Sequence, residues 1–170
     1  MKFFLDTGNI KDIEAMVPLG IVDSVTTNPS LMAKEGGDPK KIIKQICQIV
    51  KAPVSAEVVA LDAAGMIAEG REWAELDEHI VVKVPFTRAG VQATKALADD
   101  GIKVNVTLCF SANQALLAAK AGATYISPFV GRLDDVSEDG MTVIRELAEI
   151  FRNYEELDHC EILAASIRHP

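Results

Sequence analysis

Residues Ile80–Pro85 read IVVKVP, a run of β-branched side chains interrupted by a single lysine. Such a run is too short for an independent helix and has the composition of a buried strand. Similar runs recur along the chain, and they predict seven strands, at Lys2–Asp6, Ser24–Asn28, Val54–Val58, Ile80–Pro85, Lys103–Leu108, Tyr125–Val130 and Glu161–Ser166.

Amphipathic stretches separate these runs and predict six helices. Asp38 and Pro39 offer an N-cap followed by proline at the first helical position, and the apolar residues of 42–50 then fall on one stripe. Residues 143–151 repeat that spacing. Ser111 is expected to cap a further helix that stops at Gly122, and Gly20 and Gly101 have the positions of C-terminal cap glycines.

Alternation of strands and helices with short connections predicts parallel strands. Both an open doubly wound sheet and a closed barrel fit that order. No G-x-G-x-x-G turn follows the first strand and no Walker glycine loop is present, which disfavours the nucleotide-binding open sheet. Repeats of about 20–30 residues suit the α/β class and a (β/α)8 TIM barrel of about 250 residues. We therefore predict one barrel domain over residues 1–170, ending before its eighth unit.

Composition excludes several classes of partner. The formal net charge of −8 repels phosphate backbones and anionic lipid, so neither nucleic acid nor a membrane surface is expected as a partner. The scattered cysteines and histidines predict a reducing, cytoplasmic location and no metal site. No apolar run reaches the ~18 residues of a membrane span, and the N-terminus lacks the apolar region of a signal peptide.

Polar residues lie near the carboxyl end of nearly every predicted strand, where the strand should be buried on both faces. Because these ends meet at the active-site face of a barrel, the polar residues are candidate site residues: Asp6, Thr26, Asn28, Glu57, Lys83, Asn105, Thr107, Ser127, Ser166 and Arg168.

Lys83 is the most informative of them. It has apolar neighbours on both sides and alternates with Val82 and Val84, so it faces away from them. A buried lysine amine is a nucleophile for carbonyl carbon. Taken alone, Lys83 is better interpreted as a lysine that reaches solvent or pairs with a carboxylate. The polar residues at the other strand ends reverse this preference and favour the nucleophile.

The other residue types complete a chemistry but also have ordinary structural roles. Asp6 and Glu57 can transfer protons, or simply pair with Lys83. The amides of Asn28 and Asn105 can bind hydroxyls, or serve turns. Thr26, Thr107 and Ser127 have the composition of strand residues. Arg132 and Arg168 suit a phosphate, which needs such donors in an acidic protein, or are exposed loop arginines.

These strand ends, taken together and in order, resemble the small transaldolases and their relatives the fructose-6-phosphate aldolases. The resemblance covers the whole chain and rests on FLDT (4–7), VTTNPS (25–30), VSAEV (54–58), VKVP (82–85), NVTL (105–108), SANQA (111–115), ISPFVGRLD (126–134) and AASIR (164–168).

The resemblance implies a class I aldolase-type barrel that needs no cofactor and acts on sugar phosphates. Lys83 would form a Schiff base with C2 of a ketose phosphate such as fructose 6-phosphate or sedoheptulose 7-phosphate, and a dihydroxyacetone unit would pass to an aldose phosphate. It further implies that Asp6 is an acid/base and that Glu57 and Thr107 hold a proton-shuttling water. Asn28, Asn105 and Ser127 would bind the donor unit, Arg132, Ser166 and Arg168 the phosphate, and Thr26 would lie beside the lysine.

Two positions separate the branches of this family. Glu57 and Phe129 resemble transaldolases, whereas the aldolase branch tends to carry Gln and Tyr there. A tyrosine hydroxyl could protonate the enamine and release free dihydroxyacetone, so its absence favours transfer over simple cleavage. An aldolase remains the alternative, as does an inactive barrel fragment.

Unpaired edges beside the first and seventh strands recruit other chains. We therefore expect a homo-oligomer.

Overall fold

The computed structural model of the protein describes residues 1–169, which form seven strands, eight α-helices and two short 3-10 helices. The strands are β1 (Phe4–Asp6), β2 (Ser24–Thr26), β3 (Val54–Glu57), β4 (Ile80–Pro85), β5 (Val104–Cys109), β6 (Tyr125–Pro128) and β7 (Glu161–Ile162). The helices are α1 (Ile10–Met16), α2 (Pro29–Glu35), α3 (Pro39–Val50), α4 (Ala63–Ala74), α5 (Arg88–Asp99), α6 (Ala112–Lys120), α7 (Val130–Asp134) and α8 (Met141–Asn153). The 3-10 helices are Val17–Leu19 and Glu155–Leu157.

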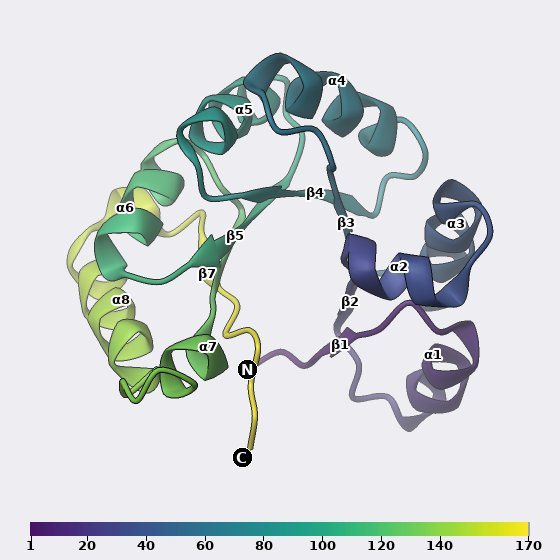
Figure 1. Ribbon diagram of the computed structural model, residues 1–170, viewed down its shortest axis with the longest axis horizontal. Helices are drawn as coiled ribbons and strands as arrows, with labels where there is room; N and C mark the ends of the chain where they lie inside the picture. The colour runs from purple at the N-terminus through teal and green to yellow at the C-terminus, as the bar shows by residue number, and fades with distance from the viewer. Residues whose placement is uncertain (170) are drawn as a thin grey trace.

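All seven strands form one parallel sheet in the order of the sequence, β1 to β7. Figure 1 shows the strands along the inner side of an arc, with the helices around its outside. A doubly wound sheet would reverse its strand order and carry helices on both faces. The curled sheet is therefore that of a partial (β/α) barrel, and the predicted number of strands is confirmed.

The prediction of six helices is wrong, because α2 and α7 lie in segments expected to be connections. Helix α2 begins after Asn28, whose side-chain oxygen accepts a hydrogen bond from Leu31 N at 2.9 Å, and Pro29 occupies its first position. Helix α7 is only five residues long and has no side-chain cap. A single turn that packs against a sheet has too few residues to establish a periodic pattern.

The helix boundaries that were predicted from capping residues agree with the structure. Asp38 accepts from Lys40 N at the start of α3, and Ser111 accepts from Gln114 N at the start of α6. Gly101 and Gly122 follow α5 and α6 with positive φ. Gly20 also has positive φ, but it ends a 3-10 helix that follows α1 directly.

The main core lies between the outer face of the sheet and the helices. Val82 and Val84 of β4 are fully buried there, together with Leu97 of α5 and Leu147 of α8. Lys83 points to the opposite, inner face, as the alternation of β4 predicts. The helices thus supply the apolar packing, which leaves the inner face free to carry polar side chains.

Strands β1 and β7 lie at the two ends of the sheet, and each pairs with one strand only among the described residues. Two contacts join the sides of the arc at this point. Lys2 Nζ lies 2.7 Å from Glu161 Oε1, and the rings of Phe4 and Tyr125 meet edge to face with centroids 5.7 Å apart. No helix within residues 1–169 is long and apolar enough to cross a membrane.

Candidate active site

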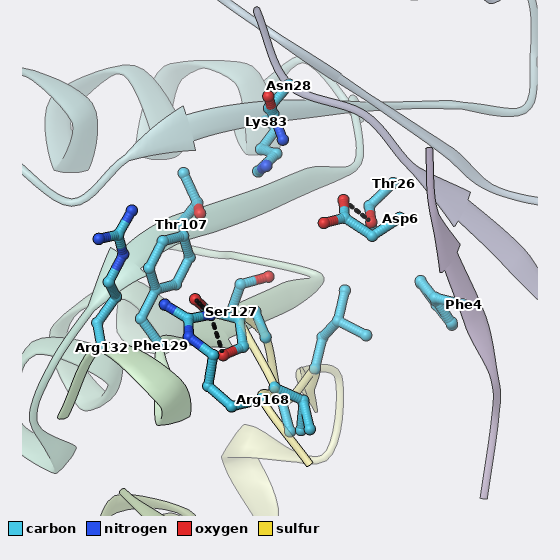
Figure 2. Close-up of a pocket in the computed structure, with 15 residues that line it drawn as sticks. Phe4, Asp6, Thr26, Asn28, Lys83, Thr107, Ser127, Phe129, Arg132 and Arg168 are labelled. Carbon is cyan, nitrogen blue, oxygen red and sulfur yellow. Dashed lines mark hydrogen bonds between the residues drawn. The ribbon is translucent and has the colours of Figure 1, made fainter. Parts of the chain in front are cut away.

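A cavity of about 480 Å³ opens at the carboxyl ends of the strands. Ten predicted site residues line it, from β1 through the segment after β7: Asp6, Thr26, Asn28, Lys83, Thr107, Ser127, Phe129, Arg132, Ser166 and Arg168. In Figure 2, Lys83, Asn28, Thr26 and Asp6 lie on one side of this space, and Phe129, Arg132 and Arg168 lie on the other. The cavity therefore has an amine and a carboxylate at one end and two guanidinium groups at the other.

Lys83 is buried, with a side chain that is 8% exposed, and it has two oxygen partners. Its ammonium group donates to the main-chain oxygen of Thr27 at 3.1 Å, and Nζ lies 3.0 Å from Oε2 of Glu57. Glu57 stands opposite Lys83 in the register of β3 and β4. Because a buried lysine charge needs a partner, this carboxylate accounts for the amine being held in the cavity wall.

Asp6 and Asn28 stand at the ends of the neighbouring strands. Asp6 is exposed, and its Oδ1 accepts a hydrogen bond from Thr26 Oγ1 at 2.8 Å. Asn28 both caps α2 and lines the cavity, so the structural role of this residue and the predicted binding role are compatible. The two side chains bring a carboxylate and an amide to the end of the cavity that holds Lys83 (Figure 2).

A chain of buried hydrogen bonds links three strands beneath the cavity. Ser127 Oγ donates to Asn105 Oδ1 at 2.8 Å, and Asn105 Nδ2 donates to Ser55 Oγ at 3.1 Å. All three side chains are almost fully buried. Ser127 lines the cavity, whereas Asn105 is covered and holds Ser127 from below.

Thr107 carries the one buried side-chain oxygen among the described residues without a hydrogen-bond partner. The β5–β6 register shifts between Val106 and Cys109, and Leu108 within this bulge has a left-handed φ of 58°. Bulges re-aim side chains, and an unpartnered buried hydroxyl costs free energy unless it is used. The Thr107 hydroxyl is therefore available to a group in the cavity.

Arg168 and Arg132 line the same cavity because α7 packs against the segment after β7. Val130 N donates to Ala165 O at 3.0 Å, and a Cβ atom at Gly131 would overlap the main-chain oxygen of Ser166 and press on the Arg168 side chain. Ser166 has a left-handed φ of 60°. The arginine side chains are thus positioned by a close approach that only glycine permits.

The guanidinium of Arg168 is oriented by three acceptors. Nη1 donates to the main-chain oxygen and to Oγ of Ser166 at 2.8 and 2.9 Å, and Nη2 donates to Asp135 Oδ2 at 2.8 Å. Arg132 has no ion-pair partner within residues 1–169. Two cationic groups of which at least one is unpaired give this end of the cavity the chemistry of an anion site.

Two predicted site residues do not line this cavity. Asn105 lies beneath it, and Glu57 faces a second, mainly apolar pocket that also contains Trp73 and Met32. Sequence reasoning missed Ser55, Thr27 and Asp135. Ser55 shares the inward face of β3 with Glu57, so the alternation in VSAEV could have identified it. Neither the Thr27 carbonyl nor the Asp135 side chain gives a comparable signal in the sequence.

The three cysteines lie in the core. Burial raises the pKa of Cys47, Cys109 and Cys160 to about 12, so the thiols are unreactive at neutral pH. Within residues 1–169, no group of three His, Cys, Asp or Glu side chains is arranged to hold a metal ion.

Residues 3–170 match the family described as transaldolase/fructose-6-phosphate aldolase. Relatives named probable transaldolase are 58% identical in Methanococcus vannielii, 59% in a strain of Methanococcus maripaludis and 56% in Caldicellulosiruptor saccharolyticus. Each alignment covers all of this chain and 78% of the relative.

Two solved structures share the fold at low sequence identity. A structure of Rhizobium etli pyruvate carboxylase superimposes with a TM-score of 0.61 at 12% identity, over 96% of this chain and 23% of that one. PhdJ bound to a substrate intermediate gives a TM-score of 0.55 at 17% identity, over 89% of this chain and 56% of that one. These two likenesses concern the fold alone.

Proposed function

Because this chain belongs to the transaldolase/fructose-6-phosphate aldolase family, we propose that it is a transaldolase, which moves a dihydroxyacetone unit from a ketose phosphate to an aldose phosphate. The observation that carries the proposal is a cavity with Lys83 at one end and Arg132 and Arg168 at the other, in which Lys83 is held from the wall by Glu57. The amine would meet the C2 carbonyl while the arginines bind the phosphate of fructose 6-phosphate or sedoheptulose 7-phosphate.

The reaction begins when the neutral amine of Lys83 attacks C2 and forms a carbinolamine. Loss of water gives a Schiff base, and each step moves a proton between nitrogen and oxygen. Glu57 lies 3.0 Å from the amine and is the nearest carboxylate. It accepts the proton that the Lys83 nitrogen loses as it adds to C2, and it returns one to the departing hydroxyl. The Thr107 hydroxyl is a second polar group in the wall of the cavity.

Cleavage then breaks the bond between C3 and C4. A base removes the proton of the C4 hydroxyl, and the electrons of the C3–C4 bond pass to the iminium. An aldose phosphate leaves the site, and an enamine remains on Lys83. Asp6 is exposed to the cavity and oriented by Thr26, so it is the candidate base. The enamine carbon next attacks the aldehyde of the acceptor, Asp6 returns the proton to the new hydroxyl, and hydrolysis of the imine frees the amine.

Transfer requires that the enamine survive until an acceptor arrives. Phe129 lines the cavity and stacks edge to face on Phe110 with ring centroids 5.8 Å apart. A phenyl ring has no proton to give, so this wall does not quench the enamine. A phenylalanine at position 129 therefore favours the transferase over an aldolase that releases free dihydroxyacetone.

Reductive trapping tests the proposal. The protein is incubated with fructose 6-phosphate, reduced with borohydride and mapped by mass spectrometry, with Lys83→Arg as the control. We expect a dihydroxyacetone-derived adduct on Lys83, absent from the variant, and aldose exchange that needs an added acceptor. Absence of an adduct in a folded sample would contradict the proposed function and favour an inactive barrel unit. Release of dihydroxyacetone without an acceptor would identify an aldolase.

A further inference from the structure

We propose that Asp135 is a built-in counter-ion at the phosphate end of the cavity, which occupies Arg168 until a phosphoryl group displaces it. The inference rests on the proposed function, since it takes Arg132 and Arg168 as the phosphate site. The predicted site residues did not include Asp135, and the reaction steps above do not use it.

The position of Asp135 follows from the shortness of α7. The helix begins after Phe129, carries Arg132 in its last turn and ends at the C-cap Asp135. Arg132 and Asp135 are three residues apart, a spacing that places two helical side chains on neighbouring positions of the same face. The carboxylate therefore lies on the face of α7 that also presents Arg132, and Arg168 approaches it from the segment after β7.

The contact with Arg168 competes with phosphate. A guanidinium has five N–H groups, and a phosphate binds best when two parallel N–H groups meet two of its oxygens. Three of the five are engaged in this structure, two with Ser166 and one with Asp135 at 2.8 Å. The Ser166 contacts fix the position of the side chain. The Asp135 contact occupies one N–H group of Nη2, so a phosphate that meets Arg168 through that group must displace the carboxylate.

Charge leads to the same conclusion. The hydrogen bond from Arg168 lowers the pKa of the Asp135 carboxyl, and the positive charge of Arg132 adds to the effect. Asp135 is therefore ionised at neutral pH and reduces the combined charge of the two arginines from +2 to about +1. A phosphate dianion that enters must replace a carboxylate and is repelled by it. Asp135 weakens the hold on free phosphate and on phosphorylated products, so that they leave more readily.

Calorimetric titration with inorganic phosphate tests the inference in wild type and Asp135→Asn. Glu149→Gln is the control, because it removes an exposed carboxylate, paired with Arg152 at 2.8 Å, from a part of α8 that does not line the cavity. We expect Asp135→Asn to bind phosphate about fivefold more tightly, the scale of a partly exposed ion pair, and the control to bind as wild type does. In the Arg168→Gln background, Asp135→Asn should give a smaller gain, because the competition for Arg168 is gone and only the repulsion by the carboxylate is relieved.

Each outcome bears on the inference. Tighter binding supports it, and damage to the fold would not produce tighter binding. Unchanged or weaker binding overturns it, because Asp135 would then be a spectator or would merely orient Arg168. Binding of phosphate by neither protein also overturns it, and the phosphate assignment with it. Borohydride trapping on Lys83 in the same samples separates these failures from failure of the proposed function, since the trap depends on the amine and not on Asp135.

Discussion

Lys83 and Glu57 face each other across neighbouring strands, with Nζ 3.0 Å from Oε2 and side chains only 8% and 15% exposed. The pair is more buried than any other ion pair within residues 1–169, the next being His79 and Asp77 at 31% and 20% exposed. A buried ion pair is weak evidence for stability, because removing two charges from water offsets most of their attraction. Its position in the wall of the barrel favours a role in reaction instead.

Replacement of Glu57 by Gln should therefore slow Schiff-base formation strongly while the protein remains folded. The amide oxygen still accepts a hydrogen bond from Lys83 but takes no proton, and loss of a positioned acid/base costs about 100-fold or more in rate. The measurement is the rate of borohydride-trappable adduct after mixing with fructose 6-phosphate. Glu72→Gln, which removes the exposed partner of Lys40, is the control and should leave that rate unchanged. An equal rate in Glu57→Gln would exclude proton transfer by this residue.

Thr107→Val should move stability and activity in opposite directions. The hydroxyl is buried without a partner among the described residues, so an isosteric methyl group should stabilise the fold by about 1 kcal/mol. The same change removes a polar group from the cavity beside Lys83, and we expect turnover to fall about tenfold or more. Chemical denaturation and aldose exchange measure the two effects.

Thr94→Val provides the matched comparison for Thr107. Thr94 is equally buried, but its hydroxyl donates to Gly90 O at 2.8 Å on α5, away from the cavity. Its loss should destabilise the fold by about 1 kcal/mol and leave turnover unchanged. Full activity in Thr107→Val would show that the hydroxyl has no part in the reaction.

The sequence predicted the strands well because each strand has a strong local signal. In β4, Lys83 alternates with Val82 and Val84, and that period alone identified both the buried face and the side that faces the cavity. Most of the polar residues predicted at strand ends line one cavity, because parallel strands bring their carboxyl ends to one face, whatever the helices between them do.

The features that sequence could not provide depend on distant contacts. Asp135 lies in a run of polar residues, and only the approach of Arg168 from 33 positions away gives it a role. The bulge that holds Leu108 in a left-handed conformation has no glycine to mark it. Helix α7 is fixed by tertiary hydrogen bonds such as Val130 N to Ala165 O, and its own residues supply no cap.

Gly131→Ala should weaken the binding of sugar phosphates directly, in addition to lowering the stability of the fold. The new methyl group would overlap the Ser166 carbonyl and push on Arg168, so α7 and the segment after β7 must separate. We expect KM for fructose 6-phosphate to rise about tenfold, and overpacking to destabilise the fold by about 1–3 kcal/mol. Steady-state kinetics with a parallel denaturation curve measures both.

Gly20→Ala is the control for that prediction. Gly20 has a φ of 69° and open space around its Cβ position, and it is remote from the cavity. Alanine there should destabilise the fold by about 1–2 kcal/mol through backbone strain alone with no change in KM. If Gly131→Ala raised KM no more than Gly20→Ala did, the packing of α7 against Ser166 would have no role in phosphate binding.

The three cysteines should make folding stability fall as the pH rises above 9. Desolvation raises the pKa of each folded thiol from 9.0 to about 12, whereas the unfolded thiols ionise near their ordinary pKa. Between these values the native state binds more protons than the unfolded state, so the free energy of unfolding decreases with pH. Denaturation curves from pH 8 to 11 should show this loss, and a Cys→Ala variant at all three positions should lose less. At pH 8, a thiol reagent should label three cysteines only after denaturation; rapid labelling of the folded protein would contradict the burial of these side chains.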